Sequence, residues 1–175
     1  GILEEMDVDV WLTFVRETSA GGDPVLPLIY GEAGLTWQSA LILARTGERI
    51  AIVGRFEVEA ARSVGAYPVV ISYDESIRPE LLAVLERLNP QRIALNYSTN
   101  DVLADGLSHG LYQVLMGYLA GTPFADRIVS AEAIIGKLRG RKTPGEIARI
   151  RAAVETTRQI YERTFDYVQP GMSEI

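Results

Sequence analysis

The stretch Leu138–Ile175, LRGRKTPGEIARIRAAVETTRQIYERTFDYVQPGMSEI, contains the signals that decide how the chain is organised. Thr143 and Glu146 have the spacing of a capping box, in which each side chain accepts a bond from the backbone N–H of the other residue. Pro144 occupies the first helical position, where its missing N–H costs no hydrogen bond. This stretch therefore predicts a helix that starts at Pro144 and ends near Val168, about 37 Å long.

Apolar and semi-apolar residues recur along this helix at spacings of three and four, which predicts one stripe of an amphipathic helix. They are Ile147, Ile150, Val154, Thr157, Tyr161, Thr164 and Val168. Pro170-Gly171 ends the helix, and Ser173-Glu174-Ile175 then looks like the start of another. At the other end, Gly1 is not an initiator Met, and Ile2, Leu3 and Met6 look like the end of an amphipathic helix. We therefore expect a fragment of a longer protein.

The same stretch resembles the domain junction of the creatinase/aminopeptidase P/prolidase family, the pita-bread metallopeptidases. The residues that carry the resemblance are Leu138, Arg139, Lys142, Thr143, Pro144, Glu146, Ile147, Arg151, Ala152, Pro170, Gly171, Met172, Ser173 and Glu174. Residues 7–137 are similar to the amino-terminal domain of this family in the order of their elements. The resemblance implies an amino-terminal domain over residues 1–140, followed over residues 141–175 by a linker helix and the start of an absent catalytic domain.

In that family, as the resemblance implies, two Asp, one His and two Glu of the catalytic domain hold two divalent metal ions, Mn, Co or Zn. Two such ions activate a bridging water and polarise the scissile carbonyl. All five ligands would follow Ile175. We therefore expect no catalytic, cofactor-binding or metal-binding residue in this chain, and no activity from the fragment alone.

Composition gives the broad class. The chain of 175 residues is 47% hydrophobic and 23% charged, which is ordinary for a globular domain with one core. Its 23 acidic and 17 basic residues give a net charge of −6, which argues against nucleic acid and against an anionic membrane surface as partners. There is no cysteine, so thiol catalysis and disulfides are excluded. No apolar run has membrane-spanning length and no signal peptide is visible, so we expect a cytoplasmic protein.

Strand and helix patterns alternate along residues 7–139. Strands are expected over 7–15, 40–45, 49–54, 69–73, 92–97 and 127–130, and helices over 57–64, 79–88, 108–119 and 131–139. The strand over 7–15 is apolar on both faces, which predicts a central position. Thr46-Gly47 predicts a hairpin, and 16–27 a loop. The fold class is therefore α/β, with a mixed β-sheet flanked by helices and a long C-terminal helix.

Polar residues that could support chemistry have simpler interpretations. His109, the only histidine, is interpreted as a surface or capping residue beside a helix start. Asp101 and Asp105 are expected in a solvated loop, because Asp105-Gly106 favours a turn. The acidic pairs Asp74-Glu75 and Glu57/Glu59 have the same interpretation.

Glycines and aromatic residues give no stronger signal. The segment from Gly31 to Gly34 and the pair Gly54-Arg55 lack the context of a dinucleotide or phosphate site. Tyr30 and Trp37 could shape a substrate mouth, but ordinary core or loop positions are favoured.

The predicted function is that of a non-catalytic domain of a Xaa-Pro aminopeptidase or dipeptidase-like metallohydrolase. The resemblance implies a homo-oligomer, a dimer, whose amino-terminal domain walls the active-site entrance, with short peptides as substrates of the full-length protein. Three alternatives stay open. The parent could be a creatinase-like amidinohydrolase or a non-enzymatic pita-bread protein, or the chain could be a free-standing α/β binding or oligomerisation module.

Overall fold

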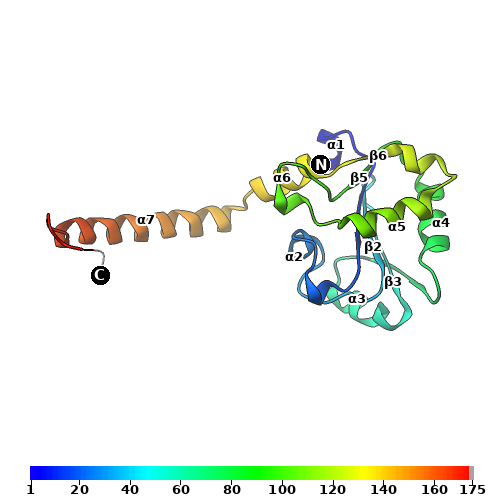
Figure 1. The fold of residues 1–175 in the computed structure, drawn as a ribbon, viewed down its shortest axis with the longest axis horizontal. Coiled ribbons are helices and arrows are strands. Elements are labelled where there is room, and N and C mark those ends of the chain that lie inside the picture. Colours follow the sequence, from blue (N-terminus) through cyan, green and yellow to red (C-terminus); the bar gives the residue numbers. More distant parts are fainter. Residues whose placement is uncertain (174–175) are drawn as a thin grey trace. The chain divides into compact units, whose positions relative to one another are not determined.

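The computed structural model describes residues 1–173, and Glu174 and Ile175, which complete the predicted second helix start, lie outside the described residues. The chain divides into two compact units, Gly1–Leu138 and Arg139–Ile175 (Figure 1). The first unit contains the sheet and the second contains the long helix. No helix among residues 1–173 is both long and apolar enough to cross a membrane.

The first unit is built on a six-stranded sheet with the order β4-β3-β2-β1-β5-β6. Its strands are β1 (Val10–Val15), β2 (Ser39–Ala44), β3 (Arg49–Gly54), β4 (Val69–Tyr73), β5 (Ile93–Leu95) and β6 (Ile128–Ser130). Strand β2 is antiparallel to both β1 and β3, whereas β3 pairs with β4, β1 with β5 and β5 with β6 in parallel. Five strands therefore run in one direction and β2 alone in the other, which confirms the predicted mixed sheet.

Helices cover both faces of this sheet. They are α1 (Ile2–Glu5), α2 (Leu26–Ile29), α3 (Val58–Val64), α4 (Arg78–Leu88), α5 (His109–Leu119) and α6 (Glu132–Gly140). On one face, α4 and α5 pack on a continuous core that includes Leu12 and Phe14 of β1. On the other face, α2 and α3 cover one cluster, and α1 and α6 cover a second that contains Trp11. All six residues of β1 are buried, so its predicted central position is confirmed.

Local signals explain most element boundaries. The β2–β3 hairpin turns through Gly47, whose φ of 94° suits glycine. Helix α4 has proline in its first turn and ends at Asn89 in the left-handed conformation. Two expectations were wrong in detail. The predicted loop 16–27 contains a 3-10 turn and the start of α2, and the strand predicted over 92–97 stops at Leu95.

The second unit consists mainly of α7 (Pro144–Tyr167). The predicted capping box is present. The Thr143 hydroxyl accepts from the Glu146 N–H at 3.2 Å, and the Glu146 carboxylate accepts from the Thr143 N–H at 2.7 Å. The last helical residue, Tyr167, lies three residues before Pro170. A single helix cannot bury its own apolar stripe, so α7 needs another surface for the packing that stabilises most protein helices.

Candidate functional site

The candidate site is the edge of the sheet where the five co-directional strands end. In open α/β sheets, ligands bind beside the carboxyl ends of the strands, where the loops converge. Four connections lie at this edge, after β1, β3, β4 and β5. They span residues 16–38, 55–57, 74–77 and 96–108, and together we call them the carboxyl-edge loops.

A buried polar network joins β1 to the residue that follows β5. The parallel register places Leu12 beside Leu95, so Thr13 and Asn96 come next to each other on the opposite face. The Asn96 amide donates to the Thr13 hydroxyl at 3.1 Å, and its carbonyl oxygen accepts from the Trp11 indole N–H at 2.6 Å. Asn96 is 2% exposed. Asn96 directly follows the last residue of β5. Its side chain forms hydrogen bonds with two polar groups of β1 that would otherwise be buried without a partner.

Asp23 extends this network into the first carboxyl-edge loop. Its carboxylate accepts from the Asn96 amide at 2.7 Å and from the Val25 N–H at 2.9 Å, and the residue is only 4% exposed. The backbone of Gly106 passes directly against it. A Cβ at Gly106 would lie 2.0 Å from the carboxyl carbon of Asp23. Loops 16–38 and 96–108 are thus fixed to each other through one buried carboxylate.

Glu57 holds the far end of loop 16–38. Its carboxylate accepts from the N–H groups of Thr36 and Trp37. The Trp37 ring lies over Gly54, where a Cβ would come within 2.5 Å of the ring. Trp37 also packs edge-on against Phe56, whose side chain is 73% exposed. The start of β2 and the end of β3 therefore present an aromatic cluster to solvent at the same edge.

Tyrosines at this edge are held in their neutral form. Burial, followed by the charges of Glu57 and Tyr118, raises the pKa of Tyr73 to about 12. Its hydroxyl donates to the Gln38 carbonyl at 2.7 Å. Burial and then the neighbouring Tyr112 raise the pKa of Tyr97 above its ordinary value. These hydroxyls therefore act as neutral hydrogen-bonding groups at physiological pH.

A cavity of about 470 Å³ opens in the last carboxyl-edge loop. Its lining residues come from the loop that follows β5 and from the first turn of α5. They are Tyr97, Ser98, Asp105, Leu107, Ser108, His109 and Tyr112. Its volume lies within the range of sites for small ligands. We call it the Asp105 cavity.

The negative charge of the chain is concentrated at this edge. The carboxyl-edge loops contain eight acidic and two basic residues, and the rest of the chain contains 15 of each. The net charge of −6 therefore arises entirely from these loops. Asp74 pairs with Arg55, but several other acidic side chains make no ion pair with residues 1–173. These are Glu17, Glu32, Glu75, Asp101 and Asp105.

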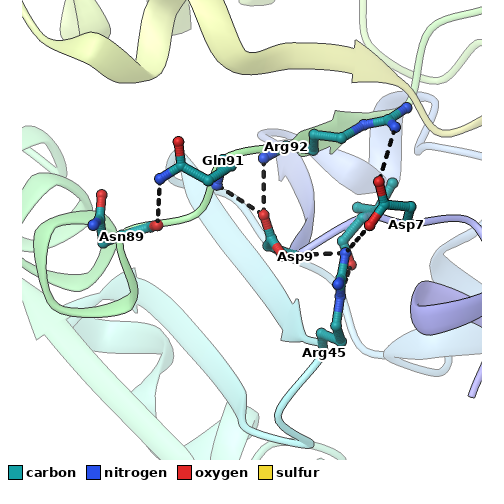
Figure 2. A network of polar contacts seen from close by, with 7 residues as sticks. Asp7, Asp9, Arg45, Asn89, Gln91 and Arg92 are labelled. Carbon is teal, nitrogen blue, oxygen red and sulfur yellow. Dashed lines mark hydrogen bonds and ion pairs between the residues drawn. The ribbon is translucent and has the colours of Figure 1, made fainter.

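At the opposite edge of the sheet, several acidic side chains form ion pairs. Figure 2 shows Arg45 between Asp7 and Asp9, with ion pairs of 3.0 and 3.1 Å. Asp9 also accepts from the backbone N–H groups of Gln91 and Arg92 at 2.8 and 3.0 Å. These contacts join the starts of β1 and β5 to the end of β2. They are structural, and they leave no comparable excess of negative charge.

The residues singled out in the sequence lie as follows. His109 is exposed at the first position of α5, and Ser108 supplies the cap by accepting from the Leu111 N–H. Asp101 and Asp105 lie in a loop, as expected, and flank a 3-10 turn. The ordinary interpretation of Tyr30 is also confirmed, since it is a core residue at 2% exposure.

Neither the Asp23–Asn96 network nor the Asp105 cavity was predicted from the sequence. A weak signal existed for the network, because Thr13 is a polar residue in an otherwise apolar strand and Asn96 follows the next one. Within the described range, residues 1–173, no three or more His, Asp or Glu side chains form a group that could hold a metal ion.

No protein-family model matches the chain, and no curated protein matches it either. Solved structures do. The chain is similar to the X-Pro aminopeptidase from Thermotoga maritima, with 18% identity, a TM-score of 0.61, and coverage of 98% of this chain and 44% of that chain. It is similar to the Xaa-Pro dipeptidase from Bacillus anthracis, with 18% identity, a TM-score of 0.55, and coverage of 98% and 42%.

A third similar structure is the creatinase/prolidase N-terminal domain of an X-Pro dipeptidase from Streptococcus pyogenes. The identity is 14% and the TM-score 0.52, with coverage of 77% of this chain and 91% of that chain. The chain therefore has the fold of creatinase/prolidase N-terminal domains. It spans less than half the length of the two longer enzymes.

Proposed function

We propose that this chain is the non-catalytic amino-terminal domain of a Xaa-Pro peptidase-like metallohydrolase. In this proposal the domain contributes to a homo-oligomer, and its carboxyl-edge loops wall the active-site entrance of the parent enzyme. The two divalent metal ions and the catalytic residues belong to the rest of that enzyme. A cytoplasmic location stays a prediction of the sequence.

The observation that carries the proposal is that buried hydrogen bonds hold two of the carboxyl-edge loops together. The fold on which these loops lie is shared with N-terminal domains of Xaa-Pro dipeptidases. Loops that limit the length of a substrate must keep one conformation, because a flexible loop would move aside for a longer peptide. Asp23 and Asn96 supply this rigidity, because they fix two loops through buried hydrogen bonds. Phe56 supplies an exposed apolar contact at the rim.

The first test uses the full-length protein. We expect manganese-dependent cleavage of Xaa-Pro peptides and a dimeric mass by light scattering. The full-length Phe56→Ala variant should change the ratio of kcat/KM between a long peptide and a dipeptide, because it removes a rim side chain without opening the core. Val69→Ala is the control. Val69 is 43% exposed, but it is the first residue of β4 and so lies at the end of that strand away from the carboxyl-edge loops.

Each of these three measurements, of cleavage, mass and length preference, can refute a different part of the proposed function. A parent that cleaves no Xaa-Pro peptide would refute the peptidase assignment and favour an amidinohydrolase or a binding protein. A monomeric parent would refute the role in oligomerisation. An unchanged length preference in Phe56→Ala, or an equal change in Val69→Ala, would refute the placement of the wall at this edge.

A further inference from the structure

The Asp105 cavity has aromatic walls. Tyr97 and Tyr112 pack with their ring centroids 6.5 Å apart and their planes at 64°. Leu107, 7% exposed, adds an apolar side chain to the lining. Aromatic faces attract ammonium and guanidinium groups as well as apolar groups. These walls therefore suit a ligand group that is positively charged and carried on an apolar stem.

Asp105 gives the cavity its charge. One carboxylate oxygen accepts from the Ser98 N–H at 3.2 Å, which fixes the side chain. The other oxygen accepts no hydrogen bond from residues 1–173, and Asp105 forms no ion pair with them. The lining includes no Lys or Arg from that same range. A cation that enters the cavity therefore meets an oriented carboxylate with one free oxygen.

The serine hydroxyls in the lining already make hydrogen bonds within the protein. The Ser98 hydroxyl donates to Glu132 at 2.6 Å and accepts from the N–H groups of Asn100 and Asp101. The Ser108 hydroxyl accepts from the Leu111 N–H. Specific recognition is therefore left mainly to Asp105 and the two tyrosines.

The start of α5 opposes a cation, because a helix N-terminus carries about half a positive charge. Asp101 and Asp105 each carry a full negative charge in the same loop, and the carboxyl-edge loops together have a net charge of −6. The negative charge is larger, so the local field favours a cation. The same field raises the concentration of cationic ligands at this edge.

We propose that the Asp105 cavity binds a positively charged group of a peptide. The group is either the guanidinium or ammonium of a basic side chain or a free amino terminus, because both fit an acidic aromatic cavity. The peptide nature of the ligand rests on the proposed function, and it would make the parent enzyme prefer cationic peptides. The cavity itself is an observation that is independent of any catalytic activity.

His109 makes the proposal directly testable, because it lines the cavity and is the only histidine of the chain. Its ring resonances in NMR spectra therefore report on this site. The chain of residues 1–175 is titrated at fixed pH with N-acetyl-arginine amide for the side chain and with alanine amide for the amino terminus. N-acetyl-citrulline amide is the neutral probe of matching shape.

We expect a saturable shift of the His109 ring resonances with a cationic probe, with Kd on the order of millimolar, and none with the citrulline compound. Saturation by one cationic probe alone identifies the source of the cation. Asp105→Asn, which can still accept from the Ser98 N–H, should weaken binding about fivefold. Asp126→Asn, at an exposed acidic residue outside the carboxyl-edge loops, should leave binding unchanged.

The proposal is overturned if neither cationic probe saturates, if the citrulline compound gives the same shifts, or if Asp105→Asn binds as tightly as the unmodified chain. Equal weakening by Asp126→Asn would also overturn it, because it would indicate a general effect of charge. Peptidase activity plays no part in this measurement. A parent without Xaa-Pro cleavage would therefore refute the proposed function and leave the binding result standing.

Discussion

At Gly106 the chain tolerates no side chain, because the buried carboxylate of Asp23 occupies the space. Asp23 cannot move away cheaply, since Asn96 and the Val25 N–H hold it. We expect Gly106→Ala to lower the free energy of unfolding by about 1–3 kcal/mol through overpacking. Urea unfolding of the chain measures this.

Gly110→Ala is the matched control for this substitution. Gly110 lies in the first turn of α5, where a Cβ would have no neighbour within 4 Å. Alanine also favours helix over glycine, by up to about 1 kcal/mol. The stability of this variant should be unchanged or slightly higher. If both variants unfold at the same urea concentration, Gly106 is not a point of close contact and the proposed pinning of the loops is wrong.

Tyr73 should make the folded state sensitive to alkaline pH. Burial raises its pKa in the folded state to about 12, whereas an unfolded tyrosine ionises near pH 10. Between these values the unfolded chain binds fewer protons, so the free energy of unfolding falls as the pH rises. Below about pH 10 the contribution is fully present, and it is lost as the pH rises through the folded pKa.

The Tyr73→Phe variant tests this sign. It loses the hydrogen bond to the Gln38 carbonyl, so it should start less stable at neutral pH. Its stability should then fall less steeply above about pH 10 than that of the unmodified chain. Urea unfolding at a series of pH values gives both slopes. Parallel slopes would show that Tyr73 does not titrate with a raised pKa.

At the scale of elements, the cap of α7 offers a clean comparison within one helix. Thr143→Ala removes the hydroxyl that accepts from the Glu146 N–H, which should cost about 1 kcal/mol at the helix start. Amide exchange in the first turns of α7 should then be about fivefold faster. Thr156→Ala is the control, because Thr156 is mid-helix and its hydroxyl only donates back to the Ala152 carbonyl. Faster exchange in both variants would contradict a specific cap.

Elements with local signals could be predicted from the sequence, and contacts between distant segments could not. The capping box of α7 and the hairpin at Gly47 follow from residues within four positions of each other. The helix α2 was missed because Gly, Asp and Pro around it indicate a loop. Strand β5 ends early because the Asn96 side chain turns to Thr13 and Asp23, which lie 83 and 73 positions away. No pattern within a short stretch of sequence predicts a contact between residues so far apart.

The same division applies to the candidate site. The predictions that Asp105 lies in a loop and His109 at a helix start are confirmed, but the cavity also needs Tyr97, just after β5, and Tyr112, in the first turn of α5. Their shared cavity depends on how the parallel strands and α5 pack. The acidic carboxyl edge also needs the strand directions, because its charges are scattered from Glu17 to Asp105 in the sequence.

At the scale of the whole molecule, the first unit should fold without the second. Its three apolar clusters draw every member from residues 2–138, so a chain that ends at Gly140 keeps all of them. Tolerance of truncation depends on the burial of what is removed. We therefore expect the thermal midpoint of residues 1–140 to stay within about 2 °C of that of the longer chain, which corresponds to less than about 1 kcal/mol.

A chain that starts at Asp7 shows whether the assay can detect a real loss. It lacks Ile2, Leu3 and Met6, which pack against the cluster under α6. Removing this apolar contact should lower the midpoint clearly, because buried apolar area contributes about 25 cal/mol per Å². If ending the chain at Gly140 lowers the midpoint as much as starting it at Asp7, then α7 is part of the core of the first unit. The first unit would then depend on the second for its stability.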